Sequence, residues 1–118
     1  MIRVADVFDD HDSDMPTPKF APGELVEHVR YGYRGVVVAV DTICKADPSW
    51  YLANNTQPER HQPWYHVFVD DSDVCTYAAE SSLRADSVGQ AIRHPLLSLF
   101  FSGFDGKRHQ RNKKPWPG

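Results

Sequence analysis

Residues 64–69 read Trp-Tyr-His-Val-Phe-Val, and this stretch indicates the fold class more directly than any other part of the chain. Aromatic and β-branched side chains of this kind favour an extended strand. Because side chains alternate across a strand, the stretch should present two different faces. One face carries Tyr65, Val67 and Val69, and the other carries Trp64, His66 and Phe68. Both faces are largely apolar, so we expect this strand to contribute to a hydrophobic core.

Three neighbouring stretches predict further strands. Residues 24–29 follow a turn-forming Pro-Gly pair, and residues 35–40 read Gly-Val-Val-Val-Ala-Val. A run of β-branched residues without polar alternation is typical of a strand that is buried on both faces. Residues 74–79 come directly after a polar turn at 70–73, which indicates a hairpin with the preceding strand.

The last part of the chain predicts a helix. Pro95 suits the first helical position, and the large apolar residues after it recur at helical spacing. They are Leu96, Leu97, Phe100, Phe101 and Phe104. We expect this apolar stripe to dock on the strands. If it were exposed instead, it would form an interface between copies of the chain, and the protein would be a homo-oligomer. With a helical turn at 80–83, the elements indicate a mainly β fold, a small antiparallel β-barrel with a short C-terminal helix.

Charge divides the chain into three regions. Residues 1–18 carry five acids and one base, residues 19–106 carry eleven acids and seven bases, and residues 107–118 carry five bases and no acid. We therefore predict an acidic N-terminal arm (1–18), a single domain (19–106) and a basic tail (107–118). Within the domain, residues 42–62 form a long polar connection, and connections of that length are usually functional or mobile.

The composition is that of a soluble globular protein. The chain has 118 residues, of which 41% are hydrophobic and 25% are charged. No apolar run approaches the roughly 18 residues needed to cross a bilayer, and the first residues lack the apolar segment of a secretory signal. Cys44 and Cys75 form neither a disulfide framework nor a CxxC motif. We expect a cytoplasmic protein with no membrane partner.

Several short motifs occur in the order that they have in a known family. They are Phe20-x2-Gly23-x2-Val26-x-His28, Gly32-Tyr33-x-Gly35-Val36-Val37-Val38, Pro63-Trp64-Tyr65-His66-Val67-x-Val69 and Thr76-Tyr77-x-Ala79-Glu80-x2-Leu83. With these motifs the chain resembles the YccV-like family, also called the hemimethylated-DNA-binding or HspQ heat-shock family. The resemblance implies an SH3-like β-barrel. It also implies a binding module that either acts on DNA or serves as an adaptor in ATP-dependent proteolysis. The long connection and the aromatic C-terminal segment depart from the short HspQ proteins.

Metal binding and catalysis are the weaker interpretations of the sequence. His61 and His66 lack the second closely spaced pair of ligands that a structural zinc site requires. Cys75 could form a Cys–His pair with a strand histidine, but a free cysteine in a strand is more often a small buried residue. The chain has no glycine-rich phosphate loop and no GxSxG nucleophile motif. We therefore expect no enzyme activity, no metal and no cofactor.

DNA binding is the first of two functional interpretations that remain open. The turn at 30–34 places bases beside aromatic residues and the tail is basic, which suits contacts to phosphates and bases. The candidate contacts are Arg30, Tyr33, Arg34, Lys107, Arg108, Arg111, Lys113 and Lys114. Two observations oppose it: the domain carries more acids than bases, and no set of side chains for reading base edges can be identified.

Protein binding is the interpretation that the sequence favours. Aromatic residues gather around the long connection, and small barrels bind extended peptides in aromatic grooves or along an open strand edge. The candidate residues are Tyr31, Trp50, Tyr51 and Trp64. We predict an adaptor or specificity factor in proteolytic protein quality control, with an ATP-dependent protease or its substrate as partner. The alternative is recognition of hemimethylated duplex DNA through the turn and the basic tail.

Overall fold

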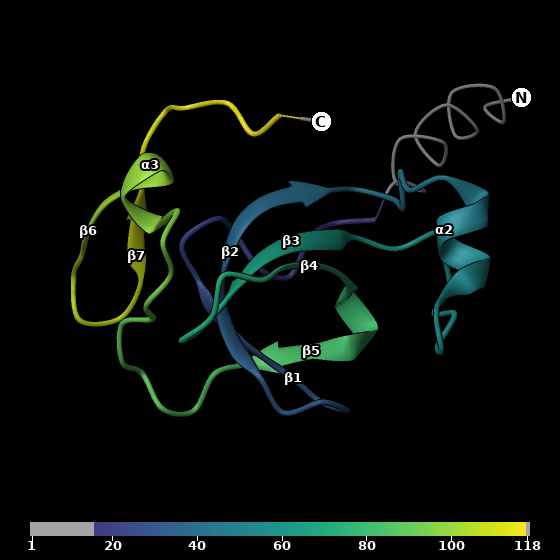
Figure 1. Ribbon diagram of the computed structural model, residues 1–118, viewed down its shortest axis with the longest axis horizontal. Coiled ribbons are helices and arrows are strands. Elements are labelled where there is room, and N and C mark those ends of the chain that lie inside the picture. Colours follow the sequence, from purple (N-terminus) through teal and green to yellow (C-terminus); the bar gives the residue numbers. More distant parts are fainter. Residues whose placement is uncertain (1–15, 118) are drawn as a thin grey trace, which may run out of the picture.

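A five-stranded antiparallel sheet occupies the centre of the molecule, with a short helix at one end and a two-stranded sheet at the other (Figure 1). The computed structural model describes residues 16–117. The order of the strands across the main sheet is β4-β3-β2-β1-β5. These strands are β1 (Leu25–His28), β2 (Arg34–Asp41), β3 (Trp64–Val69), β4 (Cys75–Ala79) and β5 (Leu83–Ala85). The mainly β, antiparallel fold is confirmed.

The edge strands of the main sheet are β4 and β5, so within residues 16–117 the sheet is not closed into a barrel. A single 3-10 turn, η1 (Glu80–Ser82), joins these two strands. The predicted helical turn at 80–83 is therefore confirmed. Because no strand among the described residues pairs with the outer side of β4, its backbone edge is open in this part of the chain.

The predicted helix after Pro95 is wrong over half of its length. Only α3 (Leu97–Phe100) is helical, and the following residues form β6 (Phe101–Phe104). β6 pairs with β7 (His109–Arg111), which lies in the segment predicted as the basic tail. The apolar spacing fits a helix, but the pairing with β7 satisfies the backbone of residues 101–104 in an extended conformation. The side chains still dock on the main sheet, because Phe100 and Phe101 are both buried.

Hydrophobic side chains are buried on both faces of the main sheet. Residues 36–38 of β2 are each fully buried, as the run of valines predicts. One face carries Phe20, Val26, Val37, Tyr65, Val67, Ala78 and Leu83, and the other carries Leu25, Val36, Val38, Phe68, Ile92, Phe100 and Phe101. The predicted alternation of β3 is confirmed where it can be followed, since Tyr65 and Val67 share the first face and Phe68 lies on the second.

A β-bulge in β2 determines where its last side chains point. The register between β2 and β3 shifts between Val37 and Ala39. As a result Val37 and Val40, three positions apart, pack against the same cluster. Asp41 then lies on the opposite face, where its carboxylate reaches His66 of β3. The extra residue thus re-aims a charged side chain, which is a common use of bulges beside functional sites.

The long connection at 42–62 contains a helix that the sequence analysis did not predict. This helix, α2 (Pro48–Ala53), begins at Asp47, whose carboxylate accepts a hydrogen bond from the backbone N–H of Ser49. An N-capping Asp followed by Pro at the first position is a strong start signal. No residue of α2 is buried, so the helix is available as the wall of a site.

Most of the predicted acidic N-terminal arm lies outside the described residues. The basic tail is in part ordered against the sheet, because Trp116 packs on His66 and Phe68 with ring centroids 5.2 and 5.8 Å apart. Among residues 16–117, no helix is both long and apolar enough to cross a membrane.

Candidate functional site

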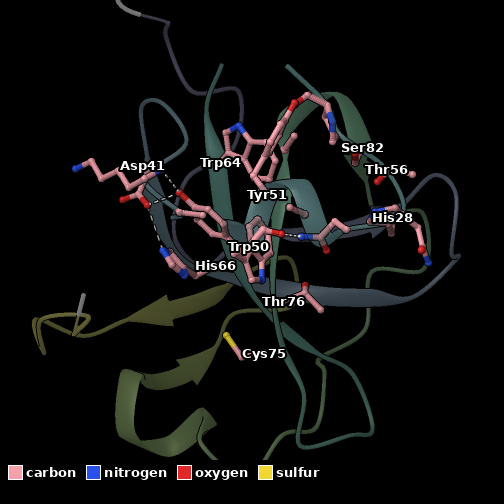
Figure 2. Close-up of a pocket in the computed structure, with 18 of the residues that line it drawn as sticks. His28, Asp41, Trp50, Tyr51, Thr56, Trp64, His66, Cys75, Thr76 and Ser82 are labelled. Carbon is pink, nitrogen blue, oxygen red and sulfur yellow. Dashed lines mark hydrogen bonds and ion pairs between the residues drawn. The ribbon is translucent and has the colours of Figure 1, made fainter. Parts of the chain in front are cut away.

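A groove of about 630 Å³ lies over the open edge of the main sheet, and we call it the β4 groove (Figure 2). All five residues of β4 line it, together with residues of α2 at one end and of β1 and the β1–β2 turn at the other. Side chains from both sides of β4 are included, since Tyr77 packs against the cluster of Cys44, Trp64 and Ala79, whereas Ala78 belongs to the first face. The groove therefore wraps around the β4 edge itself.

Aromatic rings from three elements form one end of the β4 groove. Trp50 and Tyr51 come from α2, Trp64 from β3 and Tyr77 from β4. The Trp50 ring lies 6.4 Å from that of Trp64 and 5.8 Å from that of Tyr77, and both contacts are edge-to-face. Trp64 is only 2% exposed, whereas Trp50 is 40% exposed. Trp64 is thus the buried part of this aromatic wall, and Trp50 is the part that is exposed to solvent.

Asp41 organises the polar part of the same end. Its Oδ2 accepts a hydrogen bond of 2.7 Å from the hydroxyl of Tyr77 and lies 3.3 Å from Nε2 of His66 (Figure 2). Burial lowers the pKa of His66 below its ordinary value, although Asp41 acts in the opposite direction. The imidazole is therefore neutral near pH 7 and contributes no positive charge beside Asp41.

The other end of the β4 groove is built on the β1–β2 turn. His28 Nδ1 accepts hydrogen bonds from the backbone N–H groups of Arg30 and Tyr31, which fixes the turn. The ring of Tyr31 stacks on that of His28 at 4.7 Å and is 56% exposed. Tyr33 and Thr76 share a hydrogen bond of 2.8 Å between their hydroxyls, which ties the turn to β4. An exposed aromatic ring, Tyr31 or Trp50, therefore lies at each end of the β4 groove.

The charge of the β4 groove is slightly negative. Its lining contains two carboxylates, Asp41 and Asp47, and one ammonium group, Lys45. Burial lowers the pKa values of His28 and His66, so neither adds a positive charge near neutral pH. A groove of this sign repels phosphates and is better suited to a neutral or basic polypeptide.

The structure brings together all four residues that the sequence suggested for protein binding. Tyr31, Trp50, Tyr51 and Trp64 line the β4 groove, although Tyr31 lies at the opposite end from the others. The sequence analysis did not select His28, Asp41, His66 and Tyr77 for this site. The strand register contained the signal for Tyr77, because a short hairpin places it directly opposite His66.

Two of the residues suggested for DNA binding have their guanidinium groups occupied inside the protein. Arg34 donates to Asp86 through Nε at 2.8 Å and to Asp70 through Nη1 at 3.1 Å. Arg111 donates from Nε to the backbone carbonyl of Val38 at 2.8 Å. Neither group points to a surface that could meet a phosphate without losing these partners.

The remaining candidates for DNA contacts are spread over the surface. Arg30 is exposed and lies over the ring of Tyr31, and Tyr33 is half-buried in the β4 groove. Lys107, Lys113 and Lys114 are exposed, and Arg108 is half-buried with Nη2 3.5 Å from Glu24. The turn between β6 and β7, which carries Lys107 and Arg108, lies at the end of the molecule away from α2 (Figure 1).

Cys75 is exposed and Cys44 is buried, so the expectation of a buried Cys75 is wrong. Cys75 is the first residue of β4, an edge strand of the main sheet. Its thiol nevertheless has a pKa raised above the ordinary value by local desolvation, which disfavours the thiolate that a nucleophile needs. Within residues 16–117, no three His, Cys, Asp or Glu side chains form a group that could hold a metal ion.

Comparison with known proteins shows which family the chain belongs to. The profile of the YccV-like family, described as hemimethylated DNA-binding protein YccV like, matches residues 18–108. The chain belongs to the YccV-like family. Relatives of this YccV-like chain include F-box only protein 21 of Homo sapiens and of Mus musculus, each 33% identical over 96 residues. The matched region is 79% of this chain and 15% of each relative, so the chain spans only a small part of their length. All residues that line the β4 groove lie within the family match.

Proposed function

We propose that this chain is a non-enzymatic binding module whose β4 groove accepts an extended polypeptide segment. The observation that carries the proposal is the open backbone edge of β4 inside an aromatic groove. Such an edge offers unpaired N–H and C=O groups that a peptide strand can pair with, while pockets beside it receive alternate side chains. Trp50 and Tyr31 stand at the two ends and would contact the peptide side chains.

The physiological role that we infer is that of an adaptor in proteolytic quality control. A groove that reads backbone groups and a few side chains tolerates many sequences, as a factor that selects damaged or regulatory proteins must. An ATP-dependent protease, or a substrate that it degrades, would be the partner. The small share of the F-box relatives that the chain covers is consistent with a module of larger assemblies. The strand order and the 3-10 turn between β4 and β5 support a partly open, SH3-like barrel as its scaffold.

A display library of random ten-residue peptides tests the proposal. Peptides recovered on the full chain are measured by fluorescence polarisation against the wild type and the Trp50→Ala and Tyr31→Ala variants. We expect losses of at least about tenfold, since exposed aromatics commonly dominate peptide contacts. Leu52→Ala is the matched control, because Leu52 is exposed on the same helix but does not line the groove. Recovered peptides that bind all variants equally would refute the groove as the site.

The second candidate function is binding of duplex DNA, which the description of the family favours. Fluorescence polarisation with unmethylated, hemimethylated and fully methylated duplexes over a salt series tests it. Neutralising Lys107 and Arg108 together should reduce the salt slope by about two if both contact phosphates. Arg93→Gln, which removes an exposed charge paired with Asp71, serves as control. Tight, methylation-dependent binding with no peptide recovered in the display experiment would replace the polypeptide proposal.

A further inference from the structure

We propose that the end of the β4 groove at Asp41, Asp47 and Trp50 binds the guanidinium group of an arginine residue in the bound polypeptide. This inference rests on the proposed function and specifies the side chain that the groove selects. It would give the module a preference for basic segments, in addition to the sequence-tolerant pairing with β4.

The two carboxylates each keep one oxygen out of their internal hydrogen bonds. Asp41 uses Oδ2 for both Tyr77 and His66, which leaves Oδ1 for an outside donor. Asp47 caps α2 through Oδ1 alone, which accepts from the backbone N–H of Ser49 at 2.9 Å and from its hydroxyl at 2.8 Å. A guanidinium group presents several N–H donors in a fixed fork and so can satisfy separate acceptors at once.

The aromatic wall at this end of the groove suits the same group. The exposed indole of Trp50 contacts the ring of Tyr77, and the hydroxyl of Tyr77 donates a hydrogen bond to Asp41. Tyr77 therefore connects the indole to that carboxylate. Cations bind most strongly over the face of Trp, and arginine does so more often than lysine because its planar group also stacks. The protein itself uses this contact nearby, since Cζ of Arg60 lies 4.9 Å from the ring centroid of Tyr51.

The charges that line the groove leave room for one added cation. Among the lining residues Asp41 and Asp47 outnumber Lys45, and His66 carries no charge near neutral pH because burial lowers its pKa. Arg60, which lies over Tyr51 outside the lining, also attracts Asp47. Lys45 is exposed, and its backbone N–H donates to the hydroxyl of Tyr77. Its ammonium group is the one cation in the lining, so its removal should strengthen the binding of a second cation.

Nuclear magnetic resonance titration with N-acetyl-arginine methylamide tests the inference directly. Saturable shifts of the backbone amides of Ala46 and Tyr77 report on this end of the groove. N-acetyl-citrulline methylamide, the neutral isostere, should bind at least about fivefold more weakly. Trp50→Ala should weaken the arginine probe about tenfold, and Asp41→Asn and Asp47→Asn about three- to fivefold each. Lys45→Gln should strengthen it by about threefold.

Asp47→Asn is the decisive variant, because Asn also caps helices well and α2 contributes nothing to the core. Asp73→Asn changes the net charge equally at an exposed position outside the groove and should leave binding unchanged. Equal affinity for the arginine and citrulline probes, or equal losses in Asp47→Asn and Asp73→Asn, would overturn the inference. If display peptides bind through Trp50 and Tyr31 while the arginine probe does not, this inference alone fails and the polypeptide groove stands.

Discussion

The ion pair between Arg34 and Asp86 gives the sharpest stability prediction, because a buried charge depends on it. The Asp86 side chain is 1% exposed, and Arg34 holds it with two hydrogen bonds of 2.8 and 3.1 Å. Burial by itself would raise the pKa of Asp86, but these bonds and those from backbone N–H groups hold it below the ordinary value. Arg34→Met leaves a buried carboxylate without its partner.

We expect this substitution to lower the free energy of unfolding by about 3–5 kcal/mol at pH 7. That is a large share of the roughly 5–15 kcal/mol that stabilises a domain. The assay is urea unfolding followed by tryptophan fluorescence, in which a slope of about 1–3 kcal/mol per molar converts the loss into a midpoint lower by at least about 1 M. Arg34→Met combined with Asp86→Leu should recover most of the loss, since both charges are then absent.

The matched control is Arg30→Met, which removes an exposed arginine from the same turn and should change stability by less than about 0.5 kcal/mol. If Arg34→Met behaves like this control, the pair does not hold the 86–93 segment on the sheet and the reasoning is refuted. The direction in which this stabilisation changes with pH also follows from the pKa of Asp86. Because the pKa of folded Asp86 is lowered, its contribution is present above the unfolded value near 3.8 and is lost as the pH falls through the folded value.

Two further predictions concern the contact between β7 and the rest of the fold. Gly23 has φ of +99°, and a Cβ there would strike the backbone carbonyl of His109, so Gly23→Ala should cost at least about 3 kcal/mol in urea unfolding. Gly32→Ala, at φ of +75° with open space around it, should cost only about 1 kcal/mol, and equal losses would contradict the clash. His109 is 3% exposed, and its Nε2 accepts from the backbone N–H of Ile92, so burial lowers its pKa. Because the histidine pKa is lowered in the folded protein, the free energy of unfolding falls as the pH drops below about 6.5. His109→Gln should make this decline between pH 7 and 5 less steep. An unchanged slope would count against a buried, neutral His109 ring.

The sequence predicted the main sheet well because its strands carry strong local patterns. Residues 35–40 and 64–69 differ from their neighbours in β-branched and aromatic content, and burial on both faces confirms the prediction. The segment after Pro95 failed for the opposite reason. Its spacing suits a helix, but whether residues 101–104 pair with 109–111 depends on a tertiary contact that spacing does not reveal. Asp47-Pro48 carries a helix start signal for α2, but this signal was overlooked because the segment around it is polar.

The candidate site was predictable in its residue types but not in its arrangement. The aromatic content suggested Trp50 and Tyr31, but only the fold places both of them in the lining of one groove. Asp41 was out of reach because the bulge in β2 reverses which face it occupies. Arg34 was misjudged for a related reason: its partner Asp86 lies 52 positions away, and a pattern of charges along the chain does not show which of them are paired inside.

The pairing of charges also changes what the net charge says about function. The formal charge of −3 depends on five acids in the first fourteen residues, and residues 16–117 carry twelve bases and eleven acids. Residues 16–117 are therefore nearly neutral, and their net charge does not by itself oppose DNA binding. What matters is where the basic side chains lie. Lys107 and Arg108 belong to the turn between β6 and β7, at the end of the molecule away from α2 (Figure 1). Residues of α2 line the β4 groove, and Lys107 and Arg108 do not. The groove is negative and aromatic, so a duplex held by Lys107 would leave it open. DNA binding through Lys107 and Arg108 and polypeptide binding in the β4 groove would therefore use different faces, so one does not exclude the other.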